Sequence, residues 1–160
     1  MRKTIASLAI IKDLKYQRIL IIPKIRNEIG IFQELKTFEN VEYLISADNL
    51  GKQILSIIEK HKNSNKDNVH FAENKDIILK GYKTIKSYGQ NVILTNISIH
   101  QEDENPPVYR ILKMYSTSDG GFELKKSDPV HYIPIDSSAE EIGKTVLLAF
   151  DDISADGKVK

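Results

Sequence analysis

The sequence predicts an α+β fold in which about three helices pack on one mainly antiparallel sheet of about six strands. Two observations support this prediction. Short runs rich in β-branched residues follow one another through polar, hairpin-like turns. A strand followed by a helix also occurs twice, because Ser46–Leu55 and Ser138–Leu147 share the same order of residue types. A doubly wound α/β sheet is the alternative, but it requires helices that alternate with strands throughout the chain.

The N-terminal part of the chain predicts a hairpin and the first of these strand–helix units. Thr4–Ile11 and Arg18–Pro23 are β-branched runs on either side of a polar turn, which is typical of two antiparallel strands. A short edge segment is expected at Ile29–Phe32. Phe38–Ile45 predicts the strand before the first repeat helix, and that helix should end in the polar segment 61–68.

The middle of the chain predicts one helical segment and one long strand. Residues 73–79 favour a helix that stops at Gly81. Tyr82–Tyr88 is open between a second short helix and a loop. Asn91–His100 predicts a strand, and it leads into the acidic loop 101–107, which ends in two prolines.

The C-terminal part predicts a second hairpin and the second strand–helix unit. Val108–Ser116 and Phe122–Lys126 flank the segment Thr117–Gly121, whose glycines are a strong hairpin signal. His131–Ile135 predicts the strand that leads into the second repeat helix.

Both repeat helices carry the same signals at their first turns. Ser138 followed by Glu141 forms a capping box, whereas the first copy has the serine, Ser46, without the glutamate. A glycine inside each helix, Gly51 or Gly143, costs about 1 kcal/mol relative to alanine. Because both repeat helices have a glycine at the same position, the helical turn around it is expected to pack tightly against another element. The apolar stripes of the helices are Leu50, Ile54, Leu55 and Ile58, and Ile142, Val146, Leu147, Phe150 and Ile153.

Length and composition exclude several classes of protein. A chain of 160 residues can bury a core in one domain, which we expect over residues 1–153, with a flexible polar tail at residues 154–160. The absence of cysteine excludes disulfides and thiolate metal sites. No apolar run approaches the ~18 residues that a membrane span needs. Charged residues interrupt the first apolar segment and no cleavage site follows, so we expect a cytoplasmic protein without a signal peptide.

The net charge of +1 predicts no general affinity for nucleic acids or anionic lipids, but the charge is unevenly distributed. Residues 1–96 hold 16 Lys/Arg and 10 Asp/Glu, whereas residues 97–160 hold 7 and 12. The second half of the chain is therefore acidic. Whether this produces two differently charged surfaces depends on how the halves are arranged in space.

The search for catalytic motifs finds none that is complete. Gly143-Lys144-Thr145 matches the end of a phosphate-binding loop, but Ser138 stands where that loop needs its first glycine. There is no Gly-x-Ser-x-Gly nucleophile elbow. The histidines show no metal-ligand spacing, although two of them could meet as a general acid and base, which leaves a small histidine-dependent ribonuclease as an alternative. These histidines are His61, His70, His100 and His131. We expect no enzymatic activity, no cofactor and no metal.

The acidic second half offers a surface for a basic protein partner. Carboxylates can take the places that phosphates would take on such a partner, and complementary charges accelerate association. Tyrosines next to the acidic loop are candidate aromatic anchors. The alternative is that loop 101–107 is merely solvated. The candidate partner-binding residues are Glu102, Asp103, Glu104, Tyr109, Tyr115, Asp119, Asp151 and Asp152. On the residues alone the chain is a non-catalytic binding domain, and a regulatory or ligand-binding module is as compatible with it.

The sequence resembles the immunity proteins of bacterial contact-dependent growth inhibition systems, of the CdiI type. Four features carry the resemblance: the end of the first strand pair, the two strand–helix copies, a central Lys-Thr segment with an aromatic residue after it, and a glycine-rich hairpin. These features are Ile21–Pro23, Ser46–Leu55 with Ser138–Leu147, Lys83–Tyr88 and Asp119–Phe122.

The resemblance implies a function that needs no catalytic residues. Proteins of this family bind the C-terminal toxin domain of a large adhesin exported by a neighbouring cell and block it in the cytoplasm, in a one-to-one complex. The toxins are commonly nucleases, including ribonucleases. A nuclease site is basic because it must hold phosphate, so an inhibitor that covers it would benefit from an acidic surface.

Overall fold

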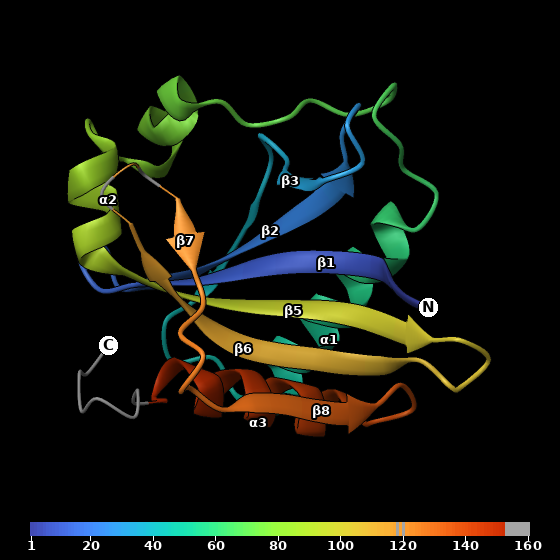
Figure 1. The fold of residues 1–160 in the computed structure, drawn as a ribbon. Coiled ribbons are helices and arrows are strands. Elements are labelled where there is room, and N and C mark those ends of the chain that lie inside the picture. The colour runs from blue at the N-terminus through green and yellow to red at the C-terminus, as the bar shows by residue number, and fades with distance from the viewer. Residues whose placement is uncertain (118, 120, 153–160) are drawn as a thin grey trace.

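The predicted α+β fold is confirmed: the chain forms one curled antiparallel sheet with helices packed on it (Figure 1). The computed structural model describes residues 1–117, 119 and 121–152. The strands are β1 (Arg2–Asp13), β2 (Arg18–Arg26), β3 (Phe32–Glu34), β4 (Glu39–Glu42), β5 (Val92–Glu102), β6 (Val108–Ser116), β7 (Phe122–Glu123) and β8 (Val130–Pro134). The helices are α1 (Ala47–His61), the 3₁₀ helix η1 (Asn74–Lys80), α2 (Ile85–Asn91) and α3 (Ala139–Phe150).

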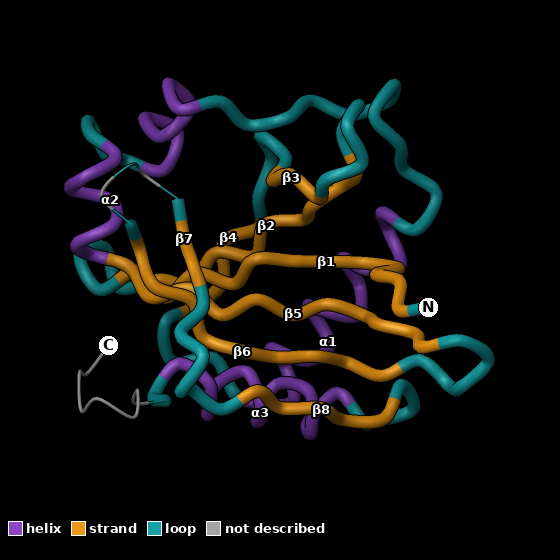
Figure 2. Tube along the Cα trace, viewed as in Figure 1, coloured by secondary structure: helices purple, strands orange, loops and turns teal. Residues whose placement is uncertain are grey.

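The sheet has the strand order β3-β2-β1-β5-β6-β7, with β4 also paired to β2 and β8 also paired to β6. Its two faces are covered differently. The helices α1 and α3 pack on one face, behind the strands in Figures 1 and 2, over Leu8, Ile10, Ile97 and Ile111. Tyrosines from the η1–α2 region cover one end of the opposite face. Within the described ranges, no helix has the length and apolarity that crossing a membrane requires.

Most predicted elements are present, and the differences have local causes. The edge strand begins at Phe32, because residues before it form a turn in which the Asn27 side-chain oxygen accepts from the backbone N–H groups of Ile29 and Ile31, at 3.1 Å each. The segment before Gly81 is a 3₁₀ helix, and Gly81 ends it with φ +84°. Tyr82–Tyr88 is resolved in favour of a helix, α2. The predicted tail at 154–160 and the predicted apolar Ile153 lie outside the described residues.

The serine caps predicted at both helix starts are present. The Ser46 hydroxyl accepts the backbone N–H of Asn49 at 3.2 Å, and the Ser138 hydroxyl accepts that of Glu141 at 3.1 Å. These bonds satisfy amides that no earlier carbonyl can reach. The predicted apolar stripes are confirmed in part, since Leu50, Ile54, Ile142, Val146 and Phe150 are buried. Leu55, Ile58 and Leu147 are only partly buried, and the sequence did not predict the buried Ile57 and Ala149.

The two halves of the chain share one arrangement. β1, β2, β3, β4 and α1 follow one another as β5, β6, β7, β8 and α3 do. The pairing is also the same, since β2 pairs with β1, β3 and β4, and β6 pairs with β5, β7 and β8. The repeat predicted for one strand and one helix therefore extends over a complete half. Residues 62–91, which include η1 and α2, connect the halves.

The halves meet reciprocally, as subunits do across a two-fold axis. In the sheet, β1 and β5 pair antiparallel with Ala9 opposite Asn96. The helices α1 and α3 cross where Gly51 faces the backbone of Ala139 and the equivalent Gly143 faces that of Ala47. A Cβ atom on either glycine would collide with the carbonyl oxygen of the facing alanine. The prediction that these glycines mark a tightly packed turn is confirmed.

Candidate protein-binding surface

The candidate acidic residues occupy separate parts of the molecule. Residues 102–104 form the β5–β6 turn at one end of the sheet, and the C-terminal end of α3 lies at the other (Figure 1). The two sets of residues are separated because α3 runs along the length of the sheet. It starts after β8, near the β5–β6 turn, where Pro134 pairs with Val108, and its C-terminal end lies at the opposite end of the sheet. Asp119 lies in a third place, the β6–β7 turn.

The acidic residues also differ in how accessible they are. Residues 102–104 are exposed, with Glu102 3.9 Å from the guanidinium of Arg2. Asp151 is exposed at the end of α3. The Asp152 carboxylate, in contrast, is largely buried and lies 3.2 Å from the His131 ring, while the backbone oxygen of Asp152 accepts from the ammonium of Lys113 at 3.3 Å. Asp152 therefore fastens the end of α3 to the sheet.

Of the two candidate aromatic anchors, Tyr109 lies in the core. Odd-numbered residues of β6 point toward the helices, because strand side chains alternate between faces, and Tyr109 is only 3% exposed. This corrects the expectation that it offers a surface to a partner. Tyr115 is partly exposed, with the ammonium groups of Lys113 and Lys125 at 5.1 and 4.2 Å from its ring centre.

The uneven charge of the sequence becomes an uneven charge in space. The first half builds the β4–β2–β1 side of the sheet and the second half the β5–β6–β8 side. At the end of the sheet that holds the β5–β6 turn, α3 also begins (Figure 1). Asp136 before the helix and Glu140 and Glu141 in its first turn are exposed there. Sequence analysis assigned Glu141 only to helix capping. We call this surface the acidic end, and it consists of Glu102, Asp103, Glu104, Asp136, Glu140 and Glu141.

An apolar groove, which the sequence did not predict, lies between the last turns of α1 and the ends of β1 and β2. Its volume is about 560 Å³. The turn between β2 and β3 forms part of its wall. The same turn carries Ile29 and Ile31, which are not among the lining residues but are 77% and 58% exposed beside them. Exposed apolar side chains gathered at one place are typical of protein-binding sites. The apolar lining residues are Ile5, Ala6, Leu8, Pro23, Ile25, Phe32, Ile58 and Ile99.

The rim of the groove is mainly basic. Arg26, Lys62 and Lys66 line it, against one lining carboxylate, Glu28. His61 also lines it, and partial burial together with the charge of Lys60 lowers the pKa of the His61 ring. Sequence analysis missed this site because its walls come from segments far apart in the chain, which meet only through strand pairing and helix packing.

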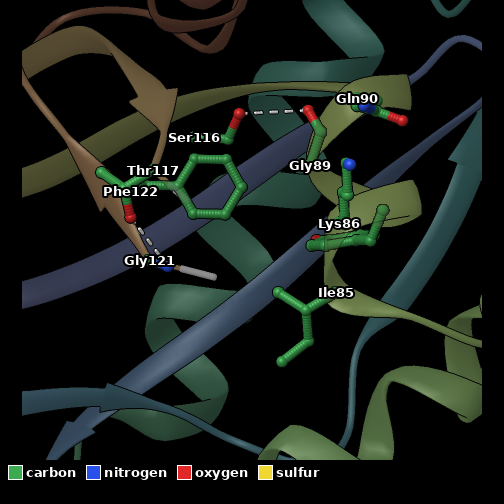
Figure 3. A pocket seen from close by; sticks show the side chains of 9 residues that line it. Ile85, Lys86, Gly89, Gln90, Ser116, Thr117, Gly121 and Phe122 are labelled. Carbon is green, nitrogen blue, oxygen red and sulfur yellow. Dashed lines mark hydrogen bonds between the residues drawn. The ribbon is translucent and has the colours of Figure 1, made fainter. Parts of the chain in front are cut away.

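A second, smaller cavity of about 240 Å³ lies between α2 and the β6–β7 turn (Figure 3). There the Ser116 hydroxyl donates to the carbonyl of Gly89 at 3.2 Å, and the backbone N–H of Gly121 donates to Thr117 Oγ1 at 3.1 Å. Lys86 and Tyr88 are its ionisable lining residues. Burial raises the pKa of Tyr88 well above its ordinary value, so its phenol stays neutral. This lining provides no general acid–base pair.

Three of the four histidines have a side-chain partner close by in the sequence or on the neighbouring helix end. His61 lies 3.3 Å from the Ser64 hydroxyl, His100 lies 2.8 Å from that of Ser98, and His131 is paired with Asp152. In the part of the chain that the structure describes, no three His, Asp or Glu side chains are grouped so that they could hold a metal ion.

The duplicated sheet with two helices crossed on one face is an architecture that recurs in solved structures of bacterial proteins. One is the CdiA-CT/CdiI toxin and immunity complex from Yersinia pseudotuberculosis, a chain of which matches with a TM-score of 0.59 and 16% identity, over 92% of this chain and 95% of that one. Another is a protein of unknown function from Neisseria meningitidis, with a TM-score of 0.61 and 14% identity, over 93% of each chain. The resemblance to CdiI-type proteins is thus confirmed at the level of the fold. No protein-family model matches the sequence, and no curated protein matches it.

Proposed function

We propose that this chain is an immunity protein that binds the toxin domain of a contact-dependent growth inhibition adhesin and neutralises it in the cytoplasm of the cell that makes both. The observation that supports this most is the fold shared, over nearly the whole chain, with a chain of a toxin–immunity complex. Neutralisation requires tight binding alone, so an immunity protein needs no catalytic residues of its own.

We further propose that the toxin is a nuclease, for example a ribonuclease, held in a one-to-one complex. The acidic end supports this part of the proposal. Its six carboxylates are exposed at the same end of the sheet, and a nuclease site that holds phosphate presents the opposite charge. Such complementarity accelerates association and selects the partner.

Co-expression tests the proposal. The toxin domain encoded beside this gene should stop growth when it is produced alone, and growth should be restored when this chain is produced with it. Toxin domains from unrelated systems should still stop growth in the presence of this chain. Light scattering on the purified mixture should give the mass of one chain plus one toxin domain. If cells die equally fast with and without this chain, the immunity function is excluded.

A ligand-binding module is a second candidate, and the groove beside α1 is the observation that favours it. Its volume of about 560 Å³ lies in the range of small-molecule sites. A metabolite that fits the groove should raise the melting temperature of the protein, because a ligand that binds only the folded state stabilises it. Stabilisation by a metabolite combined with failure to protect against the neighbouring toxin would favour this candidate.

A further inference from the structure

We infer that the groove beside α1 receives one aromatic side chain of the protein partner, flanked there by a carboxylate. The inference rests on the proposed function for the identity of the partner, and on the duplication of the fold for the shape and chemistry of the occupant.

The position in the second half that is equivalent to the groove is occupied by a side chain of this protein itself, and that side chain indicates what fits the groove. Gly51 and Gly143 are equivalent in the helix crossing, so Ile58, seven residues after the first, is equivalent to Phe150, seven residues after the second. Phe150 is 1% exposed, and the ammonium of Lys12 lies 5.9 Å from its ring centre. Ile58 lines the groove instead. The second half thus buries an aromatic ring where the first half is open.

The sheet beneath the groove differs in the same direction. Arg26 pairs with Phe32 as Ser116 pairs with Phe122, which makes the β2 and β6 positions equivalent. Lys24 therefore corresponds to Met114. Because Ser7 pairs with Lys24 as Leu94 pairs with Met114, Ser7 is equivalent to Leu94, and Ala6 is equivalent to Ile93. The groove-lining residues Ala6, Pro23 and Ile25 accordingly correspond to Ile93, Lys113 and Tyr115. Each of these three residues is smaller than its counterpart, and so is Ile58, so four replacements open this space. Leu8 is the exception, because it is larger than its counterpart Thr95.

The charged residues around the groove indicate which group of the partner lies next to the aromatic ring. Four cationic side chains, Lys24, Arg26, Lys62 and Lys66, line the groove together with one carboxylate, Glu28. The Arg26 guanidinium donates to the backbone carbonyls of Gly30 and Thr4. Lys62 and Lys66 are held by exposed ion pairs with Glu59 and Asp67, at 2.6 and 3.5 Å. Exposed pairs of this kind contribute about 0–1 kcal/mol, so a partner carboxylate can replace them at little cost. An apolar pocket with a basic rim and exposed isoleucines fits an aromatic anchor next to an acidic residue.

The decisive variant is Ile58→Phe, which gives the first half the ring that the second half already has. The protein should fold, with an unchanged or higher melting temperature, because the ring enters existing space. Its complex with the neighbouring toxin domain should dissociate at a concentration at least about 30-fold higher than the wild-type complex, the loss expected for a blocked anchor. Leu148→Phe is the matched control, since Leu148 is 56% exposed on α3, and it should bind as the wild type does.

The charge at the rim is tested separately. Replacing Lys62 and Lys66 together by glutamate should weaken the same complex severalfold, whereas replacing Lys144, which is exposed on α3, by glutamate should not. If both the Ile58→Phe and the lysine variants bind the toxin as the wild type does, the inference is wrong while the immunity function stands.

A small probe decides the matter even if no toxin binds the wild type and the proposed function fails. Titration with 3-phenylpropionate, a phenyl ring with a carboxylate, should shift the backbone amide NMR signals of Ile25, Ile58 and Ile99 at roughly millimolar concentration. Ile58→Phe should abolish these shifts, and the cationic 3-phenylpropylamine should produce weaker ones. The absence of any shift by 3-phenylpropionate in the wild type would contradict the inference.

Discussion

The two glycines at the helix crossing each remove one side chain where two backbones touch. A methyl group at either position would collide with a carbonyl oxygen, which is part of a helix and cannot rotate away. Gly51→Ala and Gly143→Ala should therefore each lower the free energy of unfolding by about 1–3 kcal/mol or more, although alanine favours helices. Urea denaturation measures this directly.

The control for this prediction lies one residue further along α1. Lys52→Ala removes an exposed ion pair with Asp48 and should change the free energy of unfolding by less than about 0.5 kcal/mol. If the Gly51→Ala variant is as stable as the wild type, α1 and α3 do not approach each other closely in solution.

Two histidines with a lowered pKa, His61 and His100, make stability depend on pH. Burial, and secondly the charges of Arg110 and Arg2, lower the pKa of His100. The unfolded chain therefore takes up a proton at higher pH than the folded chain does, and stability is lost as pH falls from about 6.5 through the folded pKa. The melting temperature of His100→Gln should fall less between pH 7 and pH 5 than that of the wild type. Identical slopes for the two proteins would contradict this assignment.

Elements were easier to predict than the site that they form. Ser46 and Ser138 gave the helix starts because a capping bond involves only residues of the same turn. The start of β3 was placed too early, because the apolar residues Ile29 and Ile31 suggested a strand, whereas side-chain bonds from Asn27 hold them in a turn. Tyr109 was misplaced for a similar reason: alternation along a strand does not reveal which face is buried.

The equivalence of α1 and α3 makes a paired prediction possible at the scale of elements. Leu50 and Ile142 occupy the same position in the two helices, and neither is accessible to solvent. Leu50→Asp and Ile142→Asp should each lower the free energy of unfolding by about 3–5 kcal/mol, because each buries an unpaired charge.

Leu148→Asp, on the exposed face of α3, should change the free energy of unfolding by no more than about 0.5 kcal/mol. A large loss in only one of the two buried variants would mean that the halves contribute unequally to the core. Thermal denaturation of the three variants side by side distinguishes these outcomes.

At the scale of the whole molecule, two sets of candidate acidic residues lie at opposite ends of the sheet, and the two sets should behave differently. Replacing Glu102, Asp103 and Glu104 by their amides should slow association with the proposed toxin partner roughly tenfold at low salt and flatten its salt dependence, because charges at the edge of an interface act on the rate of encounter. Stopped-flow kinetics at several salt concentrations measures both effects. An unchanged association rate at low salt would contradict the role of the acidic end.

Replacing Asp151 and Asp152 by their amides should lower the free energy of unfolding instead of the association rate. The Asp152 carboxylate lies against His131 and is largely buried, so its neutralisation loosens the end of α3 before it changes any approach of a partner. The sequence placed both sets in one list because it shows charge and order along the chain. It does not show that α3 runs back along the sheet and separates them.

The junction between the halves also has a consequence for synthesis on the ribosome. β1 is a central strand, but its partner β5 starts at Val92, far behind it in the chain. At the usual rate of translation β1 waits roughly 5–20 s with one edge open, and an open apolar edge invites pairing with other chains. The connector at residues 62–91 lengthens this interval. The nascent first half is therefore the stage at which this protein is most exposed to aggregation, and chaperones that shield strand edges would act on it there.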